Sequence, residues 1–434
     1  MNLIIYSINL FNDFFWKYIG FFIICITGLY LTLYTKGLQF RALWNMRANL
    51  SNILSDNISS SGIHPFKLIF ASAGGMIGIG NIVGIGTAVS IGGPGAILWI
   101  WVGSFCGMLI KYSEIYLSMQ YRIPNNDNSY DGGLMFYVHR AFNSQVLAML
   151  SAVLLCVYGI EIYQFVVLVD RFEIVTNHYI SREIIVITLT MGVLYASIGG
   201  IKRLANICSV MMPFFMSAYI IIGIYIILCN ASSLPNVLYN IFYSAFNGQA
   251  AVGGFAGSTV GLCAYYGVSR GVYAGDIGVG SDSIVHSESR EQSPDKQAKL
   301  AIYTLFGDTL ICTVSTMLIA VTGAWRDINL IKSDAISIVI NSYIPYGNLF
   351  MTGVLFFAGF TTIIAFLTIG IKSAKYISPK YGKTIYTLLA IPVFISFSYI
   401  SQNEALTIMT SCAGLLILIN IAAILKLHRN IQYR

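Results

Sequence analysis

The chain has 434 residues, of which 56% are hydrophobic and only 10% are charged, and its mean hydropathy is +0.73. Soluble globular domains carry roughly 25% charged residues, so this composition excludes a soluble protein. The net charge of +7 requires no nucleic-acid partner, because membrane proteins collect Lys and Arg in their cytoplasmic loops. The sequence therefore predicts an all-α polytopic protein embedded in the lipid bilayer.

Apolar runs long enough to cross a bilayer follow one another along the chain. The first run is too long for a cleaved signal peptide, so we expect a retained helix. A possible amphipathic segment, Gln39 to Leu50, lies between the first two runs. We expect about eleven spans, at residues 14–34, 66–91, 94–120, 145–170, 183–200, 207–229, 237–267, 298–324, 345–372, 382–400 and 404–426.

The distribution of positive charge predicts the orientation of these spans. With the N-terminus outside, inward ends and loops hold 20 of the 25 basic residues. Positive charge is retained on the cytoplasmic side of membrane proteins, so we expect an outer N-terminus and a cytoplasmic C-terminus. The residues left on the outer side are Lys17, Arg171, Arg182, Arg326 and Lys332.

The second span is the most informative segment. It contains six glycines between Ala73 and Gly86, and each weakens a helix by about 1 kcal/mol relative to alanine. In lipid, non-helical backbone is tolerated only where it is buried in protein or lines a cavity. Secondary transporters build midplane binding sites from such broken helices, so this span is predicted to be interrupted.

A second glycine-rich stretch suggests an internal repeat. Without the first span ten remain, and two halves of five must have opposite orientation. AGGMIGIGN (Ala73 to Asn81) opens one half and AAVGGFAGS (Ala250 to Ser258) the other, which is typical of a transporter site. The alternative is a pair of small-residue packing faces. We expect an N-terminal extra helix and amphipathic segment in 1–60, a first repeat in 61–232, and a second repeat with the C-terminal tail in 233–434.

Four stretches carry a resemblance to a known family. They are GIGNIVGIGTAVSIGGPGAILWIW followed by KYSEIYLSMQYR, GGIKRLANICSVMMPFFMSAY, GGFAGSTVGLCAYYGVSRGVYAGDIGVGS, and SPDKQAKLAIYTLFGDTLICTVSTMLIAVTG. In this order they resemble the alanine/glycine:cation symporters, also called the sodium:alanine symporter family. The resemblance implies a LeuT-type inverted repeat of five plus five helices with one extra N-terminal helix.

The resemblance also implies a function. It predicts sodium-coupled symport of alanine or glycine by alternating access, with Na⁺ as coupling ion and no other cofactor. The expected location is a bacterial plasma (inner) membrane, as a monomer or loose oligomer.

The first broken helix provides groups for both substrate and ion. Its second half begins with free N–H groups of partial positive charge, which suit a carboxylate, and Gly78, Ile79 and Gly80 are placed to supply them. Its first half ends in free carbonyls at Gly74 and Ile77, which suit Na⁺.

The resemblance assigns further residues to the site. Thr361 and Thr362 match the hydroxyl pair that completes the sodium site of LeuT-type transporters, and Asn81 matches an amide that can contact a second cation. Gln164 matches a glutamine beside the substrate, although interhelical hydrogen bonding is the alternative. Phe366 falls where the family usually has a tryptophan that closes the pocket, the alternative being an ordinary lipid- or core-facing aromatic.

The second glycine-rich stretch completes the expected pocket. Gly253, Gly254 and Phe255 would give carbonyls for the substrate ammonium and a wall for its side chain. Asp276 and Asp282 lie just past this span, in either an inner gate or a solvated loop.

Ionisable residues inside the membrane are functional candidates because their burial is costly. Glu161 lies three residues before Gln164 on roughly the same helix face, where the family usually has a small or amide residue. It binds a proton, pairs with a cationic substrate, or faces a basic residue. Glu114 and Lys111 favour a structural ion pair, and Asp308 favours helix packing.

Departures from the family leave the substrate open. Ile79 stands where the family commonly has Thr, and GDIGVGSDS stands where it has NEAGxGSAP. With the carboxyl of Glu161, these changes admit a proton-coupled transporter, or one for cationic or larger amino acids, as the alternative. An enzyme is not favoured, since the chain has no HExxH motif and no DDxxD-type acidic cluster.

Overall fold

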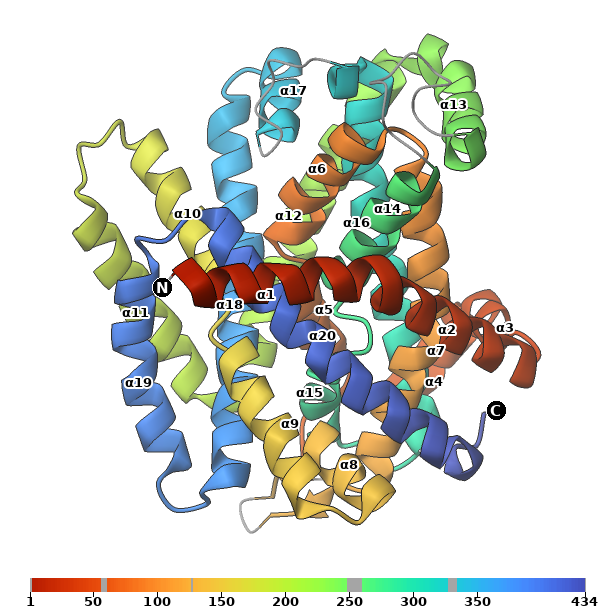
Figure 1. Cartoon of the computed structure of the whole chain (residues 1–434), viewed down its shortest axis with the longest axis vertical. Coiled ribbons are helices and arrows are strands. Elements are labelled where there is room, and N and C mark those ends of the chain that lie inside the picture. Colours follow the sequence, from red (N-terminus) through yellow and green to blue (C-terminus); the bar gives the residue numbers. More distant parts are fainter. Residues whose placement is uncertain (1, 56–60, 126–127, 248–259, 327–333, 434) are drawn as a thin grey trace.

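The computed structural model describes residues 2–55, 61–125, 128–247, 260–326 and 334–433. Helices make up nearly all of the regular structure, and most of them run along the long axis of the molecule (Figure 1). The helices of the first half are α1 Asn2–Phe14, η1 Phe15–Gly20, α2 Phe21–Tyr34, α3 Leu38–Trp44, α4 Met46–Ser55, α5 Pro65–Met76, η2 Ile79–Asn81, α6 Val83–Gly92, α7 Ala96–Gln120, α8 Leu134–Phe142, α9 Gln145–Tyr158, α10 Ile162–Val175, α11 Arg182–Ile198 and α12 Gly200–Cys229.

The second half is also helical, and one short antiparallel pair of strands lies in the first half. The strands are β1 Ile123–Pro124 and β2 Tyr130–Asp131. The remaining helices are η3 Ala231–Ser233, α13 Leu234–Asn247, α14 Val260–Ala274, α15 Asp282–Ser287, α16 Pro294–Thr322, η5 Ala324–Arg326, α17 Ala335–Tyr343, α18 Gly347–Ile377, α19 Gly382–Phe397, α20 Gln402–Leu427 and η6 His428–Asn430.

The described residues contain seven helices that are long and apolar enough to cross a membrane, or eight when the bent pair α5 and α6 counts as one span. The polytopic all-helical fold is therefore confirmed. The expected spans 183–200 and 382–400 correspond to α11 and α19, which have only 17 and 16 residues. A total of eleven spans stays a prediction.

The second expected span is interrupted, as predicted. Pro65 occupies the first position of α5, where its missing N–H costs nothing. α5 ends at Met76, and the chain bends by 66° before it continues into η2 and α6. Ile77 and Gly78 leave the helical conformation, with ψ of 84° and −163°. Backbone groups are thereby freed in the middle of an apolar segment.

A second interruption lies beyond the predicted one. Of the expected span 237–267, the structure describes the part in α13, up to Asn247, and the part in α14, from Val260. The expected site residues Gly253, Gly254 and Phe255 lie outside the described residues. The chain is non-helical between α14 and α15, where Asp276, Gly278 and Gly280 have left-handed φ values of 48°, 80° and 83°.

The two interrupted helices are antiparallel and packed together. α14 contacts α6, and α15 contacts α5. Figure 1 shows α6 above α5 and α14 above α15, so the chain ascends through the first pair and descends through the second. The short helix α8 precedes α9 at the bottom, whereas α17 precedes α18 at the top. This is the inverted repeat that characterises LeuT-type transporters.

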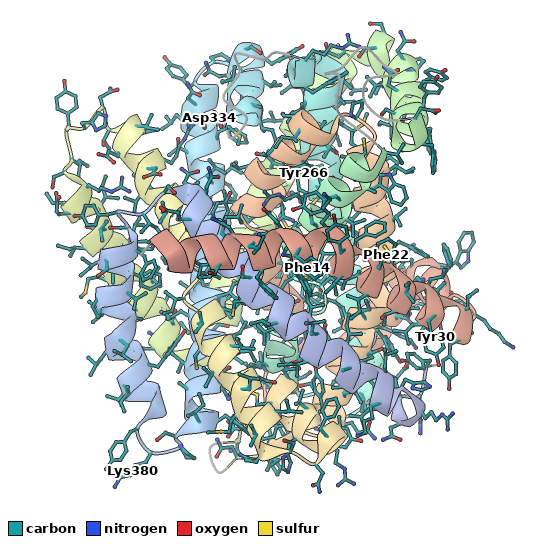
Figure 2. All side chains as sticks on the ribbon, in the orientation of Figure 1. Phe14, Phe22, Tyr30, Tyr266, Asp334 and Lys380 are labelled. Carbon is teal, nitrogen blue, oxygen red and sulfur yellow. The ribbon has the colours of Figure 1, made fainter. Side chains whose placement is uncertain are left out.

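The N-terminal helix crosses the bundle. Residues Ser7–Tyr34 form one apolar helix of 28 residues, longer than the expected span 14–34. Figure 1 shows α1 running across α20 rather than along the long axis, and α2 continues toward α7. The indole Nε1 of Trp16 donates to the carbonyl of Thr410 in α20. Phe14, Phe22 and Tyr30 are exposed on this helix (Figure 2), and the amphipathic segment that follows forms α3 and α4.

A buried polar cluster joins the lower halves of both broken helices to α7. Lys111 of α7 is fully buried, and its Nζ lies 3.5 Å from Oδ2 of Asp282 at the start of α15. Ser72 of α5 donates to the same oxygen at 2.9 Å. The expected Lys111–Glu114 pair is therefore wrong. Glu114 accepts a hydrogen bond from the Asn420 side chain of α20 instead.

Candidate functional site

A small cavity, here called the central cavity, lies between the two interruptions. It leaves about 10 Å³ for the centre of a water molecule, which is room for about one water. The side chains themselves fill the site in this conformation. Its wall is formed by Gly75, Met76, Gly80, Asn81, Tyr158, Glu161, Gln164, Tyr273, Ala274, Asp276 and Phe366.

The first interruption presents backbone N–H groups to this site. Ile79 N–H donates to Oε1 of Gln164 at 3.0 Å, and Gly78 N–H donates to Oδ1 of Asn81 at 2.9 Å. Gly80 forms part of the cavity wall. The structure thus brings together the amides and the glutamine expected beside the substrate. The Ile79 amide thus already has a side-chain oxygen as its acceptor.

Gly78 is packed too tightly for any side chain. A Cβ atom there would lie 2.5 Å from both polar atoms of the Gln164 amide and 2.7 Å from Oγ1 of Thr362. Its φ of −114° is open to any residue, so contact alone explains the glycine. Gly78 therefore lies between the expected substrate site and the expected sodium site.

Two of the expected sodium ligands meet between α5 and α18. The Thr362 hydroxyl donates to the carbonyl of Gly74 at 2.9 Å. Thr361 lies one residue before it and donates to Phe357 O and to Ala358 O within its own helix. Ile77, the fourth expected oxygen donor, is fully buried at the break. These are hydroxyl and carbonyl oxygens, the ligand type that hard cations prefer.

Asn81 links the first interruption to α16. Its side-chain Oδ1 accepts from Gly78, while Nδ2 donates to Asp308 Oδ1 and contacts Sγ of Cys312. Asn81 and Asp308 are fully buried. The expected packing role of Asp308 thus has a defined partner, and Asn81 positions the turn that presents the amides.

Three cavity residues were missed or left open by the sequence analysis. Tyr158 donates to Oδ1 of Asp276 at 3.1 Å, and its ring meets Phe366 edge to face at 5.1 Å. Tyr273 donates to Oε1 of Glu161 at 3.4 Å. Asp276 is therefore a buried part of the cavity wall and not a solvated loop residue. The sequence signal for Asp276 was its position between Gly275 and Gly278, within a stretch that interrupts an apolar run.

An upper cavity of about 240 Å³ lies between α1, α14 and α20. Asp13, Arg270 and Asn403 contribute polar groups to it, and Tyr273 lines both this cavity and the central one. Figure 2 shows Tyr266, another of its residues, in the upper half of the molecule. The ring of Tyr273 thus separates the upper cavity from the candidate site.

A lower cavity of about 850 Å³ opens on the opposite side. Partial burial and the nearby charges of Arg290 and Lys67 lower the pKa of His64, which caps α5. The lower end of the molecule is marked by Lys380, whereas Asp334 lies at the top (Figure 2). The basic residues of the lower cavity are Lys67, Lys202, Arg290, Lys372, Lys375 and Lys383.

One motif in the upper cavity resembles an enzyme signature. Residues 267–271 read Gly-Val-Ser-Arg-Gly, the pattern of a serine nucleophile elbow, which requires a strand-to-helix turn. Ser269 lies inside helix α14 and donates to the carbonyl of Tyr265. The motif is therefore part of a regular helix.

Comparisons with known proteins agree with this geometry. The model of a family described as "Sodium:alanine symporter family" matches residues 1–433. An uncharacterized transporter of Haemophilus influenzae is 31% identical over 415 residues, covering 93% of this chain and 89% of its own length. The sodium/alanine symporter AgcS of Methanococcus maripaludis is 26% identical, covering 88% and 85%. A sodium/proton-dependent alanine carrier protein of Bacillus sp. (strain PS3) is also 26% identical, covering 86% and 87%.

Solved structures share the fold. MhsT in complex with L-phenylalanine aligns with a TM-score of 0.58 at 14% identity, covering 82% of this chain and 88% of that chain. A Na⁺-coupled sialic acid symporter in a substrate-bound outward-open state aligns with a TM-score of 0.55 at 13% identity, covering 88% and 82%. At these identities the likeness shows a LeuT-type fold and nothing about the substrate.

Proposed function

Because the chain belongs to the sodium:alanine symporter family, we propose that it couples the entry of Na⁺ to the uptake of a small neutral amino acid, alanine or glycine. Membership makes it an integral membrane secondary transporter and not an enzyme. The amino acid and the coupling ion are the steps that we propose. The observation that supports them is the pair of interruptions that line one small cavity.

The substrate carboxylate is assigned to the amides of the first interruption. It would replace Oε1 of Gln164 as the acceptor of the Ile79 N–H, at the start of the second half-helix, where partial positive charge favours an anion. We assign the ammonium to the second interruption, where Ala274 and Asp276 line the cavity. Phe366 closes the pocket from α18. The small volume of the central cavity favours a small substrate.

The coupling ion is assigned to the oxygens between α5 and α18. Gly74, Ile77, Thr361 and Thr362 form this set, and Asn81 contributes the amide for a second cation. When Na⁺ binds, the Thr362 hydroxyl would turn its oxygen from Gly74 toward the ion. Because the same helix α5 presents the substrate amides, Na⁺ and substrate would stabilise one conformation of the break.

The upper and lower cavities are assigned to the two sides of the membrane. The lower cavity gathers six Lys and Arg side chains, which supports a cytoplasmic lower side, an outer N-terminus and a cytoplasmic C-terminus. Alternating access would then open the central cavity first to the upper and afterwards to the lower cavity. We retain the repeat boundaries 61–232 and 233–434, preceded by 1–60, and a monomer or loose oligomer in a bacterial plasma membrane.

The proposal predicts sodium-driven uptake. Protein reconstituted in liposomes should accumulate radiolabelled alanine or glycine under an inward Na⁺ gradient. Replacing Na⁺ by K⁺ should reduce the initial rate by about tenfold or more, since coupled sites change each other's affinity by such factors. Protein-free liposomes and dissipation of the gradient with an ionophore are the controls. Equal rates in Na⁺ and K⁺ would rule out sodium as the coupling ion.

A second prediction concerns the sodium ligands. Thr362→Val keeps the shape of the side chain but removes the hydroxyl that meets Gly74 O. We expect the Na⁺ concentration for half-maximal uptake to rise by about tenfold or more, because a lost polar ligand to a charge costs roughly 1.5–3 kcal/mol. Thr316→Val is the matched control, since its buried hydroxyl bonds only within α16. An unchanged Na⁺ dependence would remove Thr362 from the ion site.

A further inference from the structure

The lower cavity holds more positive charge than the described acids around it balance. Among the described residues, Glu288 is the acid in its wall, and six Lys and Arg side chains share that wall. Glu288 pairs with Lys372. Asp131, just outside the wall, pairs with Lys372 at 3.1 Å and with Lys375 at 3.0 Å. Both acids are therefore engaged by the two lysines of α18.

Three of the other basic side chains meet uncharged oxygens. Lys67 donates to the side-chain oxygen of Asn206 at 2.7 Å, and Nε of Arg290 donates to a backbone carbonyl at 2.7 Å. Nζ of Lys383 lies 3.5 Å from the carbonyl oxygen of Ile198. These bonds neutralise no charge. An ammonium group has three donors and a guanidinium group five, so each cation also retains donors for a further acceptor.

The fold collects these cations from distant parts of the chain. Lys67 lies in the first turn of α5, Lys202 in the first turn of α12, and Lys383 in the first turn of α19, while Arg290 follows α15. Like charges that face one cavity repel each other. A bound anion would therefore stabilise the arrangement of these four elements.

One edge of the lower cavity meets the lipid-facing surface. Ile198 lines the cavity and is 46% exposed. It ends a stripe of exposed apolar side chains at helical spacing along α11. The stripe consists of Ile184, Ile187, Met191, Tyr195 and Ile198. α19 contacts α11 and exposes Ile385 and Leu388 (Figure 1). A lipid whose acyl chains cover these two helices would have its headgroup at the edge of the cavity.

Charge and position together identify the anion. Basic pockets between transmembrane helices on the cytoplasmic side bind anionic headgroups, and about 850 Å³ lies in the range of pockets that hold drug-sized ligands. We propose that the lower cavity binds the phosphate of an anionic phospholipid headgroup, with Lys202 and Lys383 at its lipid-facing edge. Because Lys67 and Arg290 share the cavity, the headgroup lies beside the lower ends of both broken helices.

The proposal is tested by thermal shift with the complete protein in a non-ionic detergent. The probes are short-chain phosphatidylglycerol, phosphatidylcholine with the same chains, and inorganic phosphate, each at the same concentrations. Phosphatidylglycerol should raise the apparent melting temperature by about 3 °C at saturation, because a ligand that binds the folded state stabilises it. Phosphatidylcholine carries its own positive charge and inorganic phosphate has no acyl chains, so both should shift it much less.

The decisive variant is Lys202→Gln with Lys383→Gln. Both side chains are exposed, so the variant should fold. The phosphatidylglycerol concentration for a half-maximal shift should rise by about 25-fold, since each lysine near an anionic lipid contributes about fivefold.

The matched control is Lys17→Gln with Lys380→Gln. It removes the same charge from two exposed lysines outside the cavity, and Lys380 lies at the lower end of the molecule just before α19 (Figure 2). This variant should keep the phosphatidylglycerol dependence of the unmodified protein.

The other outcomes each overturn the proposal. An equal shift by phosphatidylcholine would show binding through acyl chains alone, and an equal shift by inorganic phosphate would assign the cavity to a free anion. An unchanged dependence in Lys202→Gln with Lys383→Gln would place the lipid elsewhere. An equal loss in the control would show a general effect of surface charge. Because no transport is measured, each of these results leaves the proposed symport untouched.

Discussion

Replacing Gly78 by alanine should abolish amino-acid transport while the protein still folds. The new Cβ atom would lie 2.5 Å from the Gln164 amide and 2.7 Å from the Thr362 hydroxyl, distances that neither side chain tolerates without moving. Gln164 holds the Ile79 amide, and Thr362 holds the Gly74 carbonyl. One methyl group therefore displaces the proposed carboxylate site and the proposed sodium site together. A displacement of about 1 Å at a binding site can cost about 100-fold in rate.

The measurement is the initial rate of alanine or glycine uptake, with substrate binding measured separately by thermal shift in detergent. Gly84→Ala is the matched control, because a Cβ at Gly84 meets nothing within 4 Å. That variant lies in α6, six residues further along the same broken span, and should transport normally. Gly78→Ala protein that retains sodium-dependent binding would show that the break does not form the site.

The first interruption was predictable because its cause is local. Glycines concentrated in the middle of an apolar span carry a helix penalty that favours a break. The structure has this break between Met76 and Ile79, and the neighbouring residues Gln164 and Thr362 meet it. That Gln164 and Thr362 lie beside this break was predicted from the family resemblance. No local sequence pattern indicates how α10 and α18 pack against it.

The interruption at Asp276 was not predicted, because two glycine-rich stretches lie within 30 residues of each other. The stretch at 253–257 resembles the first break in composition, whereas the stretch from Gly275 to Ser281 contains Asp276. The expected span was therefore ended before the second stretch. Left-handed backbone at Asp276, Gly278 and Gly280 is a conformational property, and composition alone does not reveal it.

The course of the N-terminal helix and the ion-pair partner of Lys111 could not be predicted from the sequence either. The length and apolarity of the N-terminal helix predicted a span, but its course across α20 (Figure 1) depends on contacts such as Trp16 with Thr410. Similarly, Lys111 and Glu114 are one helical turn apart and therefore suggested an ion pair. The acid that Lys111 meets, Asp282, is brought to it by the second broken helix.

Lys111→Met should be among the most destabilising substitutions in the chain. Removing one partner of a buried ion pair leaves the other charge unpaired and costs about 3–5 kcal/mol. Asp282 would keep the hydrogen bond from Ser72 and the contact with the imidazole of His286, whose Nε2 lies 3.7 Å away. It would lose its ion pair with the buried ammonium group of Lys111. The lower halves α5 and α15 would then be held less firmly against α7.

Stability is measured as the unfolding free energy or apparent melting temperature of purified protein in detergent. Lys299→Met provides the matched control, because Lys299 and Asp295 form a partly exposed pair at 2.8 Å, and such pairs contribute at most about 1 kcal/mol.

The double variant Lys111→Met with Asp282→Asn shows whether the loss of stability comes from the unpaired charge of Asp282. Once no charge is left unpaired, much of the lost stability should return, since replacing both members of a buried pair is often nearly neutral. If the double variant is instead as unstable as the sum of the single ones, the stem of Lys111 contributes through packing alone. If Lys111→Met is no more harmful than the control, the pair does not hold α5 and α15 to α7.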